Sequence, residues 1–171
     1  MDLKKYIRDI PDFPKKGIIF KDITPLLSTP SAFKFAMDQM LEFARQQKAE
    51  AVVGIDSRGF IFGSVIAYQL GLKFVPVRKK GKLPYQTLSE KYALEYGTAE
   101  LEIHNDALHK GEKVLIVDDL LATGGTVRAT CGLVEKLGAQ VCGIAFLINL
   151  SFLNGGEKIK NYKTLTLIQY E

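Results

Sequence analysis

The stretch VLIVDDLLATGGT, residues 114–126, decides the fold of this chain. Its first four residues are apolar and three of them are β-branched, which is typical of a strand buried on both faces of a parallel sheet. Asp118 and Asp119 follow directly, so we expect them at the end of that strand, at the sheet edge where open α/β folds bind ligands. Carboxylates at this edge can accept hydrogen bonds from ribose hydroxyls.

The second half of the stretch predicts a phosphate-binding loop. Residues 123–126 read Thr-Gly-Gly-Thr and precede Val127, Cys131 and Val134, which share one face at helical spacing. Backbone amides at a helix start favour a phosphate. An Asp-Asp pair alone is typical of a turn with a helix cap, and Gly-Gly alone marks a loop. The unbroken succession of strand, acids and loop favours a sugar-phosphate site over a purely structural role.

Strands and helices alternate on both sides of this stretch. Strands separated by helices imply parallel pairing with right-handed crossovers, so the fold class is α/β, with a mainly parallel central sheet flanked by helices. The expected strands are residues 51–55, 73–77, 114–117 and 141–148, and the expected helices are residues 60–70, ended by Gly71, and 126–137, ended by Gly138.

Three segments depart from this alternation. Residues 78–110 hold a basic Gly/Pro stretch and two short alternating pieces, 92–94 and 99–103, which predict a hairpin inserted in the sheet. Residues 162–168 alternate like a further strand. Residues 31–47 predict an amphipathic helix, preceded by a Pro- and Phe-rich cap of about thirty residues; the buried stripe of that helix is Phe33, Met37, Met40, Leu41 and Ala44.

Size and charge fit a single domain, residues 1–171, which binds a small anion. A chain of 171 residues can bury a core without disulfides or a structural metal, and Cys131 and Cys142 show no ligand spacing and are interpreted as reduced core residues. The net charge of +4 comes without any nucleic-acid-binding motif. A phosphate-rich substrate explains the excess, and no nucleic-acid partner is expected.

A cytoplasmic location and no membrane association are also expected. Residues 1–6 are charged at once and lack the apolar core of a signal peptide. The longest apolar run, near residues 141–150, is too short to span a bilayer.

The quoted stretch resembles the phosphoribosyl-diphosphate motif of the type I phosphoribosyltransferases, in the spelling of the branch that acts on adenine. Residues 14–25 are similar to that branch's base-binding segment, residues 54–60 to its pyrophosphate loop, and residues 94–97 with 99–103 to its mobile catalytic loop. The resemblance covers nearly the whole chain. It implies an amino-terminal hood of about residues 1–30, a mobile flap of about residues 78–110, and a homodimer.

The resemblance implies a reaction of purine salvage, in which adenine and phosphoribosyl diphosphate give AMP and pyrophosphate. Asp118 and Asp119 orient the ribose and can stabilise the positive charge that develops on the sugar. The 5′-phosphate is anchored by the loop that follows, which consists of Ala122, Thr123, Gly124, Gly125 and Thr126.

Pyrophosphate is assigned by the resemblance to two basic segments. Asp56, Ser57 and Arg58 follow one strand, with an unusual backbone turn at Asp56–Ser57 that is expected to be a cis peptide; Arg78, Lys79, Lys80 and Lys82 follow the next. The second cluster is equally typical of a solvated loop. Mg²⁺ is the implied cofactor, held mainly by phosphate oxygens, ribose hydroxyls and water rather than by protein ligands.

Adenine is assigned to the hood and the flap. Phe20 is the implied stacking platform, and the backbone of Ile19 or Lys21 reads the edge of the base. A core phenylalanine is the usual alternative for Phe20, and some family members carry Arg in place of Lys21. Glu95 is the implied general acid/base, with Tyr96 helping to close the flap. We expect His104 and His109 to be exposed and without a role.

Two other functions remain open from the sequence. One is a phosphoribosyltransferase for a 6-oxopurine, which would keep the phosphate loop and differ in the segment 14–25. The other is a non-catalytic regulator that senses phosphoribosyl diphosphate and binds nucleic acid. Catalytic turnover separates the second from an enzyme.

Overall fold

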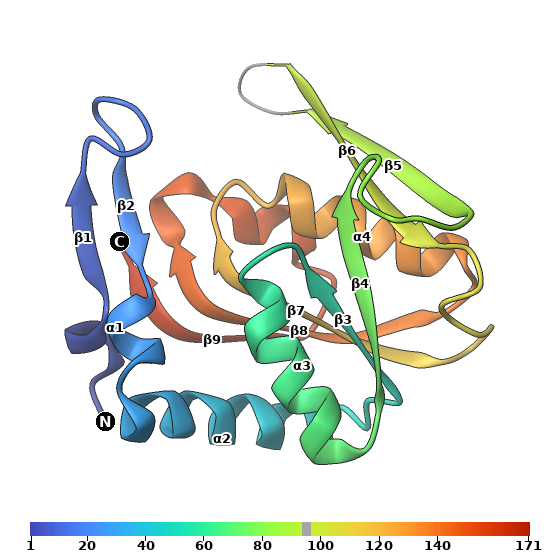
Figure 1. Ribbon diagram of the computed structural model, residues 1–171, viewed down its shortest axis with the longest axis horizontal. Coiled ribbons are helices and arrows are strands. Elements are labelled where there is room, and N and C mark those ends of the chain that lie inside the picture. The colour runs from blue at the N-terminus through green and yellow to red at the C-terminus, as the bar shows by residue number, and fades with distance from the viewer. Residues whose placement is uncertain (94–96) are drawn as a thin grey trace. The chain divides into compact units, whose positions relative to one another are not determined.

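A computed structural model describes residues 1–93 and 97–171 of the chain (Figure 1). These residues form two compact units, residues 1–39 and 40–171. No helix in the described ranges is both long and apolar enough to cross a bilayer.

The first unit is built on a small antiparallel hairpin. It contains η1 (Leu3–Tyr6), β1 (Arg8–Pro11), β2 (Ile19–Asp22) and α1 (Thr24–Leu27). Arg8 lies opposite Asp22 in the ladder, and their side chains form an ion pair of 2.7 Å. Helix α2 (Pro30–Gln46) starts here and continues into the second unit. Its expected stripe is confirmed: Met37, Met40, Leu41 and Ala44 are buried and Phe33 is half-buried.

The second unit is built on a sheet whose described part has seven strands in the order β5-β6-β4-β3-β7-β8-β9. Pairing is parallel from β4 to β9 and antiparallel for β4–β6 and β5–β6, which confirms the predicted α/β fold. The strands are β3 (Ala51–Ile55), β4 (Lys73–Lys79), β5 (Thr87–Ala93), β6 (Thr98–His104), β7 (Lys113–Leu121), β8 (Gln140–Leu150) and β9 (Thr164–Tyr170).

Two crossover helices cover opposite faces of this sheet (Figure 1). Helix α3 (Gly59–Leu70) connects β3 to β4, and α4 (Gly125–Lys136) connects β7 to β8. Both begin one residue before the predicted start, and Gly71 ends α3 in the left-handed conformation, as Gly is suited to do. Short 3₁₀ segments η2 (Ser151–Leu153) and η3 (Gly155–Ile159) follow β8.

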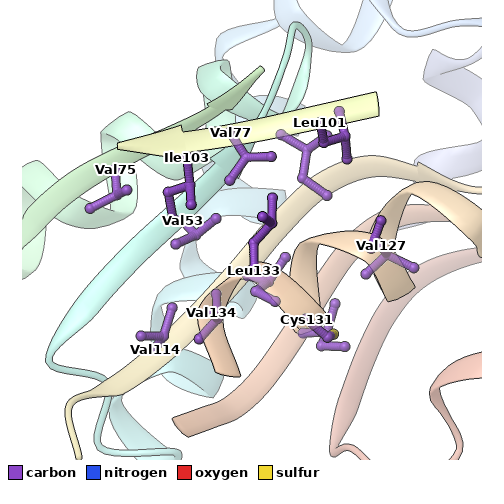
Figure 2. Close-up of a cluster of buried hydrophobic side chains, with 14 of the residues drawn as sticks. Val53, Val75, Val77, Leu101, Ile103, Val114, Val127, Cys131, Leu133 and Val134 are labelled. Atoms are coloured by element: carbon purple, nitrogen blue, oxygen red, sulfur yellow. The ribbon is translucent and has the colours of Figure 1, made fainter. Parts of the chain in front are cut away.

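The main core lies between the sheet and α4. Figure 2 shows side chains of α4 facing those of the central strands. Val127, Cys131 and Val134, predicted to share a face, are 3%, 0% and 0% exposed, which confirms the buried face of this helix. Burying such side chains is worth roughly 1.5–3 kcal/mol each, which holds α4 and the loop before it against the sheet.

One boundary matters for function, because the predicted end of the strand at Val117 is wrong. Strand β7 continues to Leu121, so Asp118 and Asp119 lie inside the strand rather than after it. The reason is that β8 is also longer than predicted: Asp118 pairs with Phe146, and Leu121 with Asn149. The partner strand extends the backbone ladder past the acidic pair, which leaves only three residues before α4.

The inserted hairpin is confirmed and is longer than the sequence predicted. Strands β5 and β6 pair in register from Thr87 with His104 to Ala93 with Thr98. Its inner strand β6 also pairs with β4 at Arg78 and Lys79. The hairpin therefore extends the sheet, and we call β5 and β6 the flap hairpin.

Candidate active site

The candidate site lies where two neighbouring parallel strands end. Strands β3 and β7 pair from Ala51 with Val114 to Gly54 with Val117. The chain leaves β3 towards β4 on one side and leaves β7 towards β8 on the other. Loops that diverge in this way open a crevice at the carboxyl ends of the strands, which is where doubly wound folds bind ligands.

The loop after β7 forms a small cradle. Residues 122–124 connect β7 to α4, and Gly124 adopts a left-handed conformation with φ of 76°. The N-cap residue of α4 is Gly124, which has no side chain to cap the first turn, so the amides of that turn are suited to an anion. A cavity of about 80 Å³ lies here, lined by Asp118 and residues 120–127. All five predicted phosphate-binding residues, 122–126, line it.

This cradle rests on Gly155, a residue that the sequence reasoning missed. A Cβ on Gly124 would lie 2.4 Å from the Gly155 carbonyl oxygen, and a Cβ on Gly155 would lie 2.1 Å from that of Ala122. Both distances are far shorter than any van der Waals contact, so the two backbones touch only because neither residue has a side chain. The Gly155-Gly156 dipeptide is the feature of the sequence that could have indicated a close approach of two backbones here.

The acidic pair is held by burial and by one cation. Asp119 is 6% exposed, and its Oδ2 lies 2.8 Å from Nη2 of Arg58. Its backbone N–H donates to Oδ1 of Asp118 over 2.9 Å. Burial raises the pKa of Asp118 well above its usual range, and the neighbouring charge of Asp119 raises it further. Burial also raises the pKa of Asp119, while Arg58 opposes that rise.

The loop after β3 supplies the other half of the site. The peptide bond between Asp56 and Ser57 is cis, as predicted. The Asp56 N–H donates to the carbonyl of Val77, and its Oδ2 accepts from Nε of Arg78, each over 2.9 Å. The contact of Arg58 with Asp119 joins the loop after β3 to strand β7. Each predicted pyrophosphate arginine thus pairs with a carboxylate of the site.

Among the residues that the structure describes, the lysines that were also predicted to bind pyrophosphate form no ion pair with the loop after β3. Lys79 and Lys82 are exposed at the end of β4 and in the turn after it. Lys80 is also exposed, and it pairs with Glu100 of β6 over 3.0 Å. The cluster of residues 78–82 is thus divided: only Arg78 bonds to the loop after β3, through Asp56.

The predicted adenine-binding residues belong to the first unit. Ile19 is 55% exposed. Phe20 is half-buried, and its ring meets that of Phe13 edge to face at 5.2 Å between centroids. The Lys21 ammonium bonds to Asp9 over 2.7 Å. The Lys21 side chain therefore makes a pair within its own hairpin, which leaves the backbone as the group suited to reading a base.

Two predictions concern the flap region. Glu95, with Tyr96, lies outside the described residues. His104 was expected to be exposed and is half-buried, because its ring packs edge to face on Tyr85 at 6.0 Å. His109 is exposed as expected.

Comparison with known proteins identifies the family. The phosphoribosyl transferase domain model matches residues 26–169. An adenine phosphoribosyltransferase of Pseudothermotoga lettingae is 56% identical over 99% of this chain and 100% of its own length. The crystal structure of adenine phosphoribosyltransferase from Thermoanaerobacter pseudethanolicus is 51% identical with a TM-score of 0.95, covering 99% of this chain and 98% of that one.

A third relative was solved with ligands. Adenine phosphoribosyltransferase of Saccharomyces cerevisiae, complexed with an imino-altritol bisphosphate and adenine, is 39% identical with a TM-score of 0.91, and the match covers 97% of this chain and 96% of the yeast chain. The agreement in sequence, in fold and in chain length has one interpretation. This chain belongs to the phosphoribosyl transferase family and, within it, to the adenine phosphoribosyltransferases.

Proposed function

We propose that this chain transfers the phosphoribosyl group of 5-phosphoribosyl 1-diphosphate to adenine, giving AMP and pyrophosphate. The observation that carries the proposal is the ion pair that joins the loop after β3 to strand β7, next to the cradle. The cradle offers backbone amides for a phosphate, and the guanidinium groups of Arg58 and Arg78 are suited to a diphosphate. The carboxylate pair lies in β7. That the acceptor is adenine is inferred from membership of the family.

The ribose 5-phosphate is proposed to bind in the cradle of residues 122–126. A phosphate there would accept hydrogen bonds from the uncapped amides of α4 and from the hydroxyls of Thr123 and Thr126. The helix dipole adds to the attraction. The close contact of Gly124 with Gly155 keeps the loop in the geometry that this binding requires.

The acidic pair is proposed to act on the sugar. Ribose hydroxyls can donate to the carboxylates of Asp118 and Asp119. As the bond from the anomeric carbon to pyrophosphate weakens, positive charge develops on the ring. Buried carboxylates stabilise such charge more than exposed ones do, because the effective dielectric constant is lower.

Pyrophosphate is proposed to bind beside Asp56, Ser57 and Arg58, together with Arg78, Lys79 and Lys82. Arg58 and Arg78 already pair with carboxylates. A guanidinium has five donors, so each can keep one carboxylate contact and still bind an oxygen of the diphosphate. The arginines are thereby oriented before the substrate arrives.

Adenine is proposed to stack on Phe20, with the backbone of Ile19 or Lys21 at its edge. Glu95 is proposed to exchange a proton with the purine ring as general acid/base, a role that is typically worth roughly 10²–10⁴ in rate. The variant Glu95→Ala should keep the circular dichroism spectrum and the melting temperature of the parent and lose turnover by that factor. Normal turnover in this variant removes Glu95 from the mechanism.

Mg²⁺ is proposed to bind with the diphosphate. Mg²⁺ prefers oxygen ligands and usually keeps several waters. Among the described residues there is no cluster of three or more His, Cys, Asp or Glu side chains suited to a metal, and Asp118 and Asp119 provide oxygen donors beside the cradle. These donors fit an ion held mainly by substrate and water. When bound, Mg²⁺ neutralises charge on the departing diphosphate.

A cytoplasmic homodimer is the proposed setting. Cys131 and Cys142 are free thiols, with pKa values raised by burial to about 12 and about 11. Unpaired, unreactive cysteines suit a reducing compartment. The dimer rests on family membership, and sedimentation equilibrium at several protein concentrations measures it directly.

Product formation from phosphoribosyl diphosphate tests the function. Adenine, hypoxanthine, guanine and xanthine are supplied separately, each with and without Mg²⁺. Metal-dependent formation of AMP, with the 6-oxopurines unreactive, supports the proposal. Turnover of a 6-oxopurine instead moves the base assignment to the alternative enzyme, and binding without turnover favours the sensor.

A further inference from the structure

Tyr92 connects the flap hairpin to the phosphate cradle. It is the last residue but one of β5, next to Ala93. Its hydroxyl accepts a hydrogen bond from Oγ1 of Thr126 over 3.1 Å. A Cβ on Gly125 would lie 3.0 Å from its ring. The Tyr92 side chain thus contacts the first two residues of α4, both of which line the cradle.

A cavity lies next to this contact. Its volume is about 260 Å³, and it separates part of β5 from the amino-terminal half of α4. The lining is formed by Glu90, Lys91, Tyr92, Ala93, Gly125, Arg128, Ala129, Gly132 and Lys158. Beside this cavity, Leu101 and Ile103 of β6 are buried in the same core cluster as Val127 and Leu133 of α4. The Tyr92 contact is the part of this connection that reaches residues lining the cradle.

A second contact holds β5 at the other end of the helix. The Glu90 carboxylate pairs with the ammonium of Lys136, in the last turn of α4. A Cβ on Gly132 would lie 3.6 Å from the Glu90 carboxyl carbon. This contact lies away from the cradle, so it can hold the strand without responding to a ligand.

We infer that Tyr92 is a positioning residue that transmits occupation of the phosphate cradle to the flap hairpin through Thr126. A hydroxyl donates one hydrogen bond and accepts two. When Thr126 turns its proton to a phosphate oxygen, its Oγ1 can accept from the Tyr92 hydroxyl instead. The bond to Tyr92 is then reversed and becomes stronger, since bonds in a chain polarise one another. Strand β5 is held more firmly as a result.

A firmer hold on β5 bears on the proton transfer that follows phosphate binding. Residue 95, the proposed acid/base, follows Tyr92 by only three positions in the chain, so we expect a firmer hold on β5 to affect kcat. The inference rests on the phosphate-binding part of the proposed function. It assigns Tyr92 no contact with substrate.

Hydrogen exchange of the variant Tyr92→Phe tests the inference. This variant keeps the ring against Gly125 and removes only the hydroxyl. Ribose 5-phosphate added to the parent protein should slow exchange of amides in residues 87–93 by roughly 3- to 10-fold, the range expected for one hydrogen bond. The variant should bind ribose 5-phosphate within about 3-fold of the parent and lack this added protection.

Kinetics and a matched variant complete the test. The kcat of Tyr92→Phe should fall by roughly 3- to 10-fold, with KM for phosphoribosyl diphosphate nearly unchanged. Tyr85→Phe removes the hydroxyl of an exposed tyrosine before β5 and should change neither quantity. Glu90→Gln should lower the melting temperature while the protection by ribose 5-phosphate remains.

Two results overturn the inference: protection of residues 87–93 in Tyr92→Phe equal to the parent's, or an equal loss of protection in Tyr85→Phe. The exchange experiment needs no turnover. A parent protein that shows the protection and makes no AMP therefore contradicts the proposed reaction and leaves the role of Tyr92 supported. A parent protein that makes AMP, together with a Tyr92→Phe variant that keeps the full protection, supports the proposed reaction and contradicts the role of Tyr92.

Discussion

The two loops of the site keep their shape by different means. The loop after β3 is held by side-chain ion pairs: Asp56 pairs with Arg78, and Arg58 pairs with Asp119. The loop after β7 is held by a backbone contact, that of residues 122–124 with Gly155. Ion pairs can exchange partners when a charged ligand arrives, whereas two touching backbones cannot separate without moving the loop. The difference suits one loop to a leaving group and the other to an anchor.

Breaking the backbone contact should have the largest effect. In Gly155→Ala the new Cβ would lie 2.1 Å from the Ala122 carbonyl oxygen, so the cradle must shift. Misplacement by about 1 Å can cost about 10²-fold in rate, and we expect a loss of that size in kcat/KM for phosphoribosyl diphosphate. Gly156→Ala is the control, because nothing lies within 4 Å of its Cβ. Equal activities of the two variants would contradict the anchoring role of Gly155.

Replacing the acidic pair, Asp118 and Asp119, should have the next largest effect. The double variant Asp118→Asn with Asp119→Asn keeps an acceptor oxygen at each position but replaces the charge-assisted hydrogen bonds proposed for the ribose by neutral ones, which are weaker by roughly 1 kcal/mol each. Affinity for phosphoribosyl diphosphate should fall about 10- to 100-fold by isothermal calorimetry. Asp106→Asn, on an exposed turn, is the matched control. Unchanged affinity in the double variant would remove these acids from the site.

The same double variant should change how stability depends on pH. Burial raises the pKa of both carboxyls in the folded protein above the ordinary value of 3.8. The folded state therefore binds protons more tightly, and stability falls as pH rises from 3.8 towards the raised values. The two asparagines should remove this decline, as measured by urea unfolding at a series of pH values from 3.8 upwards. A decline of equal size in parent and variant would exclude the pair as its source.

Breaking an exchangeable ion pair should have a smaller effect. Arg78 is 35% exposed, and pairs of this kind contribute about 0–1 kcal/mol to stability. Arg78→Met should therefore keep its melting temperature within a few degrees and raise KM for pyrophosphate in the reverse reaction about 10-fold. Lys73→Met breaks a comparable pair with Glu112 at the other end of β4 and should leave this KM unchanged. An equal rise of KM in Arg78→Met and Lys73→Met would show that the loss of any positive charge from β4 raises KM, and would contradict a specific role of Arg78.

The smallest effect should come from the exposed lysines. Lys79→Met and Lys82→Met remove charges that water and salt screen, so KM for pyrophosphate should rise by at most about 3-fold at low salt. The difference from the parent should disappear near 1 M salt, where the Debye length is about 3 Å. An effect that persists at high salt would indicate direct contact and would place these lysines with Arg78.

Much of this architecture was predictable from local pattern. Strand β3 has the predicted bounds, and both crossover helices begin one residue from the predicted start. Their patterns are strong because each element must bury a whole face. Strand β7 was predicted too short, since its polar residues 118 and 119 interrupt the apolar run. Its full length depends on pairing with β8, a contact between residues distant in sequence.

The sequence by itself determined which chemical groups the site contains: the acidic pair, the Thr-Gly-Gly-Thr loop and the two arginines. It also predicted the parallel pairing that brings them to one edge. Those features are local, and spacing and residue type specify them. Only the tertiary structure decided how the groups are partnered. Arg58 pairs with Asp119, Gly155 supports the cradle, and Tyr92 bonds to Thr126. Each of these contacts joins segments about thirty or more residues apart, so it exists only after the sheet has assembled.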